Sequence, residues 1–141
     1  MVALYQELPA SWDGVLYRAL RDDAAFRFVA IADAGDDVVR EIGTPDVDGG
    51  VVLVEPFEVP DGADEPFLDA WERLRAARAQ QRGYLGSRLY RRAGPAELRF
   101  VDVTRWSSPL MFARATALPD VEAAVAALPF ASRPALYIPA R

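Results

Sequence analysis

The stretch LRFVDVTRW, residues 98–106, places a carboxylate and an indole four residues apart on a run with strand character. Alternation along a strand puts these side chains on one face: Phe100, Asp102, Thr104 and Trp106. A second apolar run, Val51 to Pro60, carries a carboxylate at Glu55. A carboxylate with apolar surroundings and a like-charged neighbour has a raised pKa and is a candidate general base near neutral pH. Asp102 and Glu55 are therefore candidates for acid–base chemistry, and Trp106 is the indole on the same strand face as Asp102.

Several residue types that often carry chemistry are absent, because the chain contains no Cys, His, Lys or Asn and all 16 basic residues are Arg. Without Cys there is no disulfide, thiolate nucleophile or thiolate metal site, and without His there is no imidazole base or proximal haem ligand. Lysine Schiff bases are excluded as well. Catalysis must use Asp, Glu, Tyr, Ser, Thr, Arg, Trp, backbone groups or the substrate's own chemistry, and we expect no metal and no cofactor.

Length and charge limit the class of protein and its partners. A chain of 141 residues with 52% hydrophobic residues is typical of one soluble globular domain. No apolar run reaches the roughly 18 residues of a membrane span, and the N-terminus does not resemble a signal peptide, so we predict a cytoplasmic protein with no membrane partner. The net charge is −5 and the arginines are scattered among 21 acidic residues, so nucleic acid is not an expected partner.

Residues 51–141 predict a complete β-α-β-β-α-β order. The expected elements are a strand at 51–60, a helix at 65–81, strands at 84–92 and 97–106 around the turn AGPA, helices at 108–117 and 119–128, and a strand at 134–140. The helix at 65–81 is amphipathic, with Phe67, Trp71 and Leu74 on one face and its arginines mostly elsewhere. This order is that of ferredoxin-like folds, an α+β class with an antiparallel sheet.

The first 50 residues resemble part of the same module without its helix. Short strands are predicted at 2–8, 14–20 and 25–33, and the last two form a hairpin across the polar turn RDD. Three tripeptides recur: LYR at Leu16 and Leu89, RFV at Arg27 and Arg99, and ALY at Ala3 and Ala135. We interpret this region as a degenerate half-module, and chance recurrence in a biased composition is the alternative.

The chemistry-bearing residues are missing from the first copy, since Ala30 stands where Asp102 stands and Ala34 where Trp106 stands. A loop rich in Asp and Gly then extends to residue 50, with a short strand or helical turn expected at 38–43. The predicted organisation is an N-terminal half-module at 1–50 that packs on, and extends the sheet of, a main module at 51–141.

The run from VVLVEPFEVP through EPFLDAWERLRAARAQQRGYLGSRLYRR to RFVDVTRWSSPLMFARA and RPALYIPA resembles the antibiotic biosynthesis monooxygenase family. The order of these pieces is more specific than any one of them. The resemblance implies ferredoxin-like subunits that pair into a dimeric α/β barrel. Some members oxidise phenolic or anthrone rings of aromatic polyketides to quinones with O2, without flavin, haem or metal. Other members or close relatives degrade haem or act on small quinols, so the resemblance indicates the fold more firmly than the reaction.

The family's site residues are only partly kept. In the quinone-forming members an Asn is followed four residues later by Trp, and these positions are Asp102 and Trp106 here. An Asn that many members carry on the first strand falls on Glu55, a Tyr used in some members falls on Phe112, and an Arg on the last helix has no counterpart. Haem-degrading relatives use a His, so the absence of His excludes haem degradation by that route.

The first and third strands of a ferredoxin-like module are neighbours, so Glu55 and Asp102 are expected to face one space beneath the helix at 65–81. Aromatic residues are predicted to line that space and bind a planar phenol or anthrone: Phe57, Phe67, Trp71, Phe100 and Phe112. Asp102 would act as the base, Glu55 would share its proton, and Trp106 would stack and donate an N–H. With the resemblance, this predicts a cofactor-independent monooxygenase that uses O2 on a small aromatic polyketide of an antibiotic or pigment pathway.

Alternatives remain at the level of residues and of function. Arginines on the two neighbouring strands allow Asp102 to be a surface or cross-strand salt-bridge partner, and Trp106 to be core or interface packing. Pro56 after Glu55 is typical of an edge or irregular strand. The functional alternative is a non-oxygenating ligand-binding or accessory protein, or a cyclase-like enzyme of aromatic polyketide biosynthesis. Loss of the family's Asn, Tyr and Arg favours it, whereas the kept Trp and the two carboxylates favour a working pocket.

A sheet with helices on one side leaves an open apolar face, which members of the family cover by pairing, so we predict a homodimer. The N-terminal hairpin offers the alternative of covering part of that face within one chain.

Overall fold

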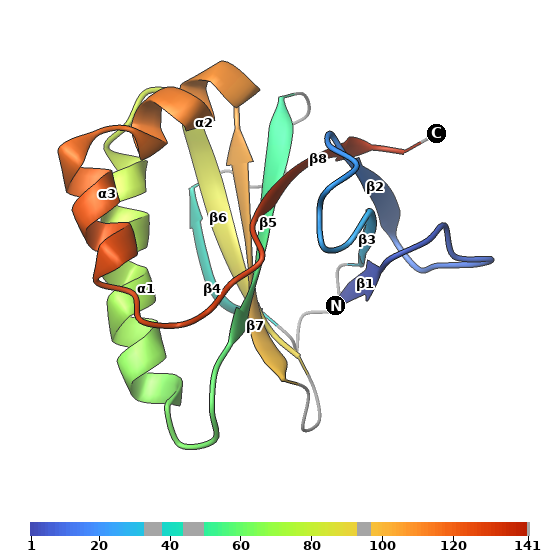
Figure 1. The fold of residues 1–141 in the computed structure, drawn as a ribbon, viewed down its shortest axis with the longest axis horizontal. Coiled ribbons are helices and arrows are strands. Elements are labelled where there is room, and N and C mark those ends of the chain that lie inside the picture. Colours follow the sequence, from blue (N-terminus) through green and yellow to red (C-terminus); the bar gives the residue numbers. More distant parts are fainter. Residues whose placement is uncertain (33–37, 44–49, 93–96, 141) are drawn as a thin grey trace.

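The computed structural model describes residues 1–32, 38–43, 50–92 and 97–140, and Figure 1 labels its elements. In chain order they are β1 (Val2–Tyr5), β2 (Val15–Ala19), β3 (Phe28–Ile31), β4 (Val38–Gly43), β5 (Val51–Glu58), α1 (Asp64–Ala79), β6 (Tyr84–Arg91), β7 (Leu98–Trp106), α2 (Pro109–Thr116), α3 (Pro119–Ala126) and β8 (Ala135–Pro139). Residues 38–43 form a strand rather than a helical turn. The predicted AGPA turn at 93–96 and most of the loop that ends at residue 50 lie outside the described residues.

The strands form one sheet in the order β1-β3-β2-β8-β5-β7-β6-β4. Its central part, β8-β5-β7-β6, has the strand order of a ferredoxin-like module, with α1 between β5 and β6 and a second helical segment between β7 and β8. That segment is divided because Pro119 has no backbone N–H to continue α2 and begins α3 instead. The predicted α+β class is confirmed, and Figure 1 shows the sheet curled into a half-barrel.

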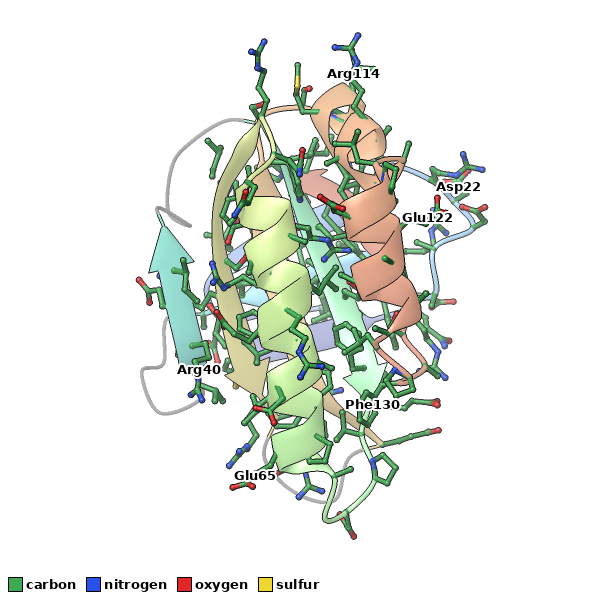
Figure 2. The ribbon with its side chains drawn as sticks, turned by 90° about the vertical axis from the view of Figure 1, so that its left-hand side faces the viewer. Asp22, Arg40, Glu65, Arg114, Glu122 and Phe130 are labelled. Carbon is green, nitrogen blue, oxygen red and sulfur yellow. The ribbon has the colours of Figure 1, made fainter. Side chains whose placement is uncertain are left out.

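The three helices cover one face of the central strands, and Figure 2 shows α1 and α3 side by side in front of the sheet. The core beneath them is aromatic: Phe67 of α1 stacks on Phe100 of β7 with ring centroids 4.7 Å apart and meets Phe57 of β5 edge-on at 5.0 Å. Phe130, labelled in Figure 2, contacts the same ring edge-on. No helix in the described ranges is long and apolar enough to span a membrane.

The other face of the sheet is covered from within the chain. Val54, Tyr90 and Val101 lie on this face of the central strands and are almost wholly buried, in one cluster with Tyr17 and Val29 of the N-terminal strands. Tyr137 of β8 donates a hydrogen bond of 2.5 Å to the carbonyl of Phe26, which ties the module to the β2–β3 connection. The N-terminal hairpin thus buries part of the face that was expected to be open.

The N-terminal strands repeat the order and register of the main hairpin. The order β1-β3-β2 corresponds to β5-β7-β6. Leu16 stands opposite Ala30 as Leu89 stands opposite Asp102, in agreement with the LYR and RFV repeats. The ALY repeat does not follow this topology, because β1 takes the place of β5 and not that of β8. The first strands therefore resemble a half-repeat without a helix, in which the position of the carboxylate is held by Ala30.

Candidate active site

The two candidate carboxylates lie directly opposite each other on neighbouring strands. Glu55 of β5 pairs with Asp102 of β7, and both side chains point beneath α1. Asp102 is 2% exposed and Glu55 is 6% exposed, so neither is a surface salt-bridge partner. β5 is an interior strand between β7 and β8, which rules out the edge position that Pro56 suggested; the irregularity is a register shift between Phe57 and Glu58.

A buried arginine lies between the two carboxylates. Arg78 Nη1 is 3.5 Å from Glu55 Oε1 and 3.6 Å from Asp102 Oδ2, and Ser132 Oγ donates a hydrogen bond of 2.8 Å to Glu55 Oε2. The expectation that the arginines of this helix point away from its apolar face is wrong for Arg78, which is 5% exposed. Its position extends the buried series 67, 71 and 74 by four residues, which places it on the same helical face.

Burial raises the pKa of the Asp102 carboxyl from 3.8 to about 6. Arg78 lowers this pKa and Glu55 raises it, while hydrogen bonds from Thr104 and Trp71 lower it. Thr104 Oγ1 donates to Asp102 Oδ1 at 2.8 Å. The result is a carboxyl group that changes its charge near pH 6, as a general base working near neutral pH requires.

Trp106 lies at the end of the same strand and is fully buried. Its ring meets Tyr84 and Phe112 edge-on, each with ring centroids 5.7 Å away. Its Nε1 is buried and has no hydrogen-bond partner among the described residues. A buried N–H without an acceptor is unfavourable by about 1–3 kcal/mol, so this donor is suited to a ligand oxygen.

A pocket of about 660 Å³ opens beside the buried cluster of Glu55, Arg78, Asp102 and Trp106. It lies between the β2–β3 connection, the start of α2 and the start of β8. Asp22, labelled in Figure 2, marks that connection at the side of the molecule. The pocket is mostly apolar. Leu136 in its wall pairs with Leu53 of β5, which lies two residues before Glu55 on the same strand. Phe112 lines the pocket and contacts Trp106, while Arg133 lines it one residue after Ser132. The pocket therefore adjoins the buried cluster at two places.

The five aromatic residues predicted to bind substrate fall into two groups. Phe112 lines the pocket. The other four, Phe57, Phe67, Trp71 and Phe100, are nearly or fully buried in the core under α1. Within the part of the chain that the structure describes, no cluster of three or more His, Cys, Asp and Glu residues is placed to hold a metal ion.

This region also contains four features that the sequence pattern did not predict: Arg78, Ser87, Tyr84 and the β2–β3 connection. Helical spacing was a sufficient signal for Arg78. Tyr84 and Ser87 are three residues apart, so simple strand alternation assigns them to opposite faces. The structure shows a register shift between Tyr84 and Gly86, and a glycine within a strand is a recognised sign of such a bulge.

Residues 50–127 match the model of the antibiotic biosynthesis monooxygenase family. The chain belongs to this family. A candidate monooxygenase of Shewanella loihica PV-4 is 30% identical, with a TM-score of 0.59 and coverage of 67% of this chain and 98% of its own. SnoaB, a cofactor-independent oxygenase from Streptomyces nogalater, is 28% identical, with a TM-score of 0.58 and coverage of 67% and 95%.

A third neighbour shares the fold over more of the chain. LmHde, a heme-degrading enzyme from Listeria monocytogenes, has a TM-score of 0.60 and covers 87% of this chain and 82% of its own at 16% identity. That coverage exceeds residues 51–141, so it includes part of the N-terminal strands. No curated protein matches the chain in sequence. The family and its oxygenase neighbours support a monooxygenase-type function.

Proposed function

We propose that this member of the family is a cofactor-independent monooxygenase that oxidises a phenolic or anthrone-type aromatic polyketide to a quinone with O2. We place it in an antibiotic or pigment pathway. The observation that carries the proposal is the buried Asp102 carboxyl, with a pKa of about 6, on the strand that also holds the unpartnered indole N–H of Trp106. The similarity to SnoaB supports an oxygenase that needs no cofactor.

The proposed reaction requires a base from the protein but no protein-bound oxidant, because O2 itself is the oxidant. An anthrone reacts with O2 once it has lost a proton, because the electron-rich carbanion can pass single electrons to O2. Its CH2 carbon becomes the second carbonyl, one oxygen atom of O2 enters the quinone, and the other leaves as water. Asp102 accepts the first proton, a role that the Asn of related members cannot fill because an amide can only hydrogen-bond to the enolate.

We place the substrate ring in the 660 Å³ pocket, against Phe112. Because Asp102 is buried, the ring reaches it only when side chains between the pocket and the cluster move. Phe112 is the residue that touches both the pocket and Trp106, so its rotation would bring the substrate's oxygen within reach of the indole N–H. Glu55 and Arg78 then set the charge around the base.

The test is oxygen uptake by the purified protein with dithranol, a model anthrone. We expect quinone formation above the rate of autoxidation, and an increase in KM of at least about tenfold in Phe112→Ala, since a phenyl contact contributes about 1.5–3 kcal/mol. Leu110→Ala is the control, because Leu110 lies on the exposed side of the same helix. No uptake above background, with dithranol still quenching tryptophan fluorescence, would overturn the oxygenase.

That outcome would favour the second candidate, a ligand-binding or accessory protein or a cyclase-like enzyme of aromatic polyketide biosynthesis. The enclosure of the carboxylates favours it: Asp102 is held by Arg78 and Thr104 inside the core. A cyclase-like reaction would use the same carboxyl for proton transfer alone, without O2.

We also propose a homodimer in the cytoplasm. The face away from the helices is partly buried by the N-terminal strands, so a second copy must bind mainly through other surfaces. Light scattering of the purified protein is expected to give the mass of two chains. The mass of one chain would refute the dimer and leave the N-terminal hairpin as the cover of that face.

A further inference from the structure

Three hydroxyl groups form a continuous hydrogen-bonded chain that ends on Asp102. Tyr84 Oη lies 2.7 Å from Ser87 Oγ, which lies 2.9 Å from Thr104 Oγ1. Thr104 Oγ1 in turn donates to Asp102 Oδ1 at 2.8 Å. Asp102, the proposed base, is thus linked through residues of β7 and β6 to Tyr84, a residue to which the proposed function assigns no role.

The local structure of β6 explains why these groups meet. Ser87 stands directly opposite Thr104 in the register of β6 and β7, so their side chains share a face. Strict alternation would turn Tyr84 to the other face, three residues earlier. The register shift between Tyr84 and Gly86 adds one residue to β6, which turns Tyr84 towards Ser87.

When Asp102 is ionised, the three hydroxyl groups all donate towards it. The Thr104 hydroxyl donates to the carboxylate, so it accepts from Ser87, and Ser87 in turn accepts from Tyr84. Ser87 and Thr104 are each 1% exposed. Tyr84 is only half-buried and lies near Arg75 of α1, so the chain runs from the interior to the surface.

We propose that Tyr84, Ser87 and Thr104 form a proton path between the buried Asp102 carboxyl and solvent. Its use in turnover rests on the proposed function, in which Asp102 takes a proton from each substrate molecule and must release it before the next. Direct release is blocked while the side chains between the pocket and Asp102 are closed, because the carboxyl is then buried. Arg78, which also contacts it, has only N–H donors and no acceptor, so it cannot receive the proton.

Release along the path conserves atoms and charge. The hydroxyl groups first turn so that each donates outward. The carboxyl O–H of Asp102 then breaks as Thr104 Oγ1 gains the hydrogen, and Thr104 gives its own to Ser87, Ser87 to Tyr84, and Tyr84 to water. One proton leaves Asp102 for solvent, and no group is oxidised or reduced. Proton uptake follows the same atoms in reverse, in the direction of the resting chain.

Charged groups face Asp102 from two other elements, Arg78 from α1 and Glu55 from β5, and neither belongs to the path. Trp71 of α1 also donates a hydrogen bond that lowers the pKa of Asp102, and it lies outside the path as well. Glu55 has its own hydrogen bond from Ser132, on the opposite side of the cluster. Ser132→Ala is therefore a matched control, since it removes a hydroxyl from the cluster outside the path.

The test follows the Asp102 carboxyl directly and needs no turnover. Its side-chain carbon resonance, assigned by its loss in Asp102→Asn, reports the rate of proton exchange by NMR relaxation dispersion at a pH near its pKa of about 6. We expect this rate to fall at least about tenfold in Ser87→Ala and in Tyr84→Phe, and to recover in Ser87→Thr, which restores the hydroxyl. Ser132→Ala is expected to keep the wild-type exchange rate.

Unchanged exchange in both Ser87→Ala and Tyr84→Phe would overturn the path. Tyr84→Phe changes only a half-buried hydroxyl, so it carries the test if the Ser87 variant fails to fold. Oxygen uptake with dithranol separates this result from the proposed function. Slowed exchange without any dithranol oxidation in the wild type would keep the path and reject the oxygenase. Dithranol oxidation by the wild type, with unchanged proton exchange in Ser87→Ala and Tyr84→Phe, would keep the oxygenase and reject the path.

Discussion

Arg78→Met is expected to lower the free energy of unfolding by about 3–5 kcal/mol at neutral pH, because it leaves two buried carboxylates opposite each other without their shared cation. Methionine keeps most of the volume and the apolar stem of the arginine, so packing changes little. The measurement is urea unfolding followed by tryptophan fluorescence.

The loss in Arg78→Met is expected to shrink in acid. Without the guanidinium the pKa of Asp102 rises further, so Asp102 is protonated and neutral at a higher pH and its burial becomes less unfavourable. Arg73→Met is the control, since Arg73 is exposed on the outer side of the same helix, where a substitution usually changes stability by no more than about 0.5 kcal/mol. Equal losses in the two variants at neutral pH would contradict the role of Arg78 as the shared cation.

The fold was predictable because its signals are local. The apolar run of β5, the helical spacing of Phe67, Trp71 and Leu74, and the alternation in β7 each specify an element without knowledge of its neighbours. The order of these elements then leaves few topologies, because a β-α-β-β-α-β chain with short connections favours the ferredoxin-like arrangement. The opposition of Glu55 and Asp102 followed from that strand order.

The environment of the carboxylates was not predictable in the same way. A charged residue on the apolar face of a helix is usually predicted to point to solvent. Arg78 is stabilised in the interior because it pairs with Glu55 and Asp102 on the facing strands. Tyr84 joins the cluster through a bulge, and a single inserted residue reverses the face that alternation assigns. Both features depend on partners from distant parts of the sequence.

The pocket depends on a still longer range of contacts. Its walls combine the β2–β3 connection with α2 and β8, segments more than 80 residues apart in the chain. The N-terminal strands were expected to extend the sheet or to cover part of its open face, and the structure shows them joining the sheet at β8 and burying part of that face. The half-module thereby also forms one wall of the pocket in which we place the substrate.

Asp102→Asn is expected to lower the kcat for dithranol oxidation by about 10²–10³, because an amide cannot accept the substrate's proton. In the wild type, kcat/KM should rise with pH through about 6 as the Asp102 carboxyl, whose pKa is raised by burial, becomes ionised. The variant should lose this rise. Oxygen uptake across this pH range, corrected for autoxidation, measures both effects, and Asp120→Asn on the exposed side of α3 is the control.

Asp102→Asn is also expected to change how the free energy of unfolding depends on pH, an effect that does not require turnover. The pKa of Asp102 is about 6 in the folded state and 3.8 as the ordinary value, so between these values the folded protein binds more protons than the unfolded chain. Its contribution to stability is therefore greatest in acid and is lost as the pH rises through about 6, a difference of about 3 kcal/mol. Asp102→Asn should remove that slope. Full activity in a variant that has lost the slope would show that hydrogen bonding at this position suffices, and would refute Asp102 as the base.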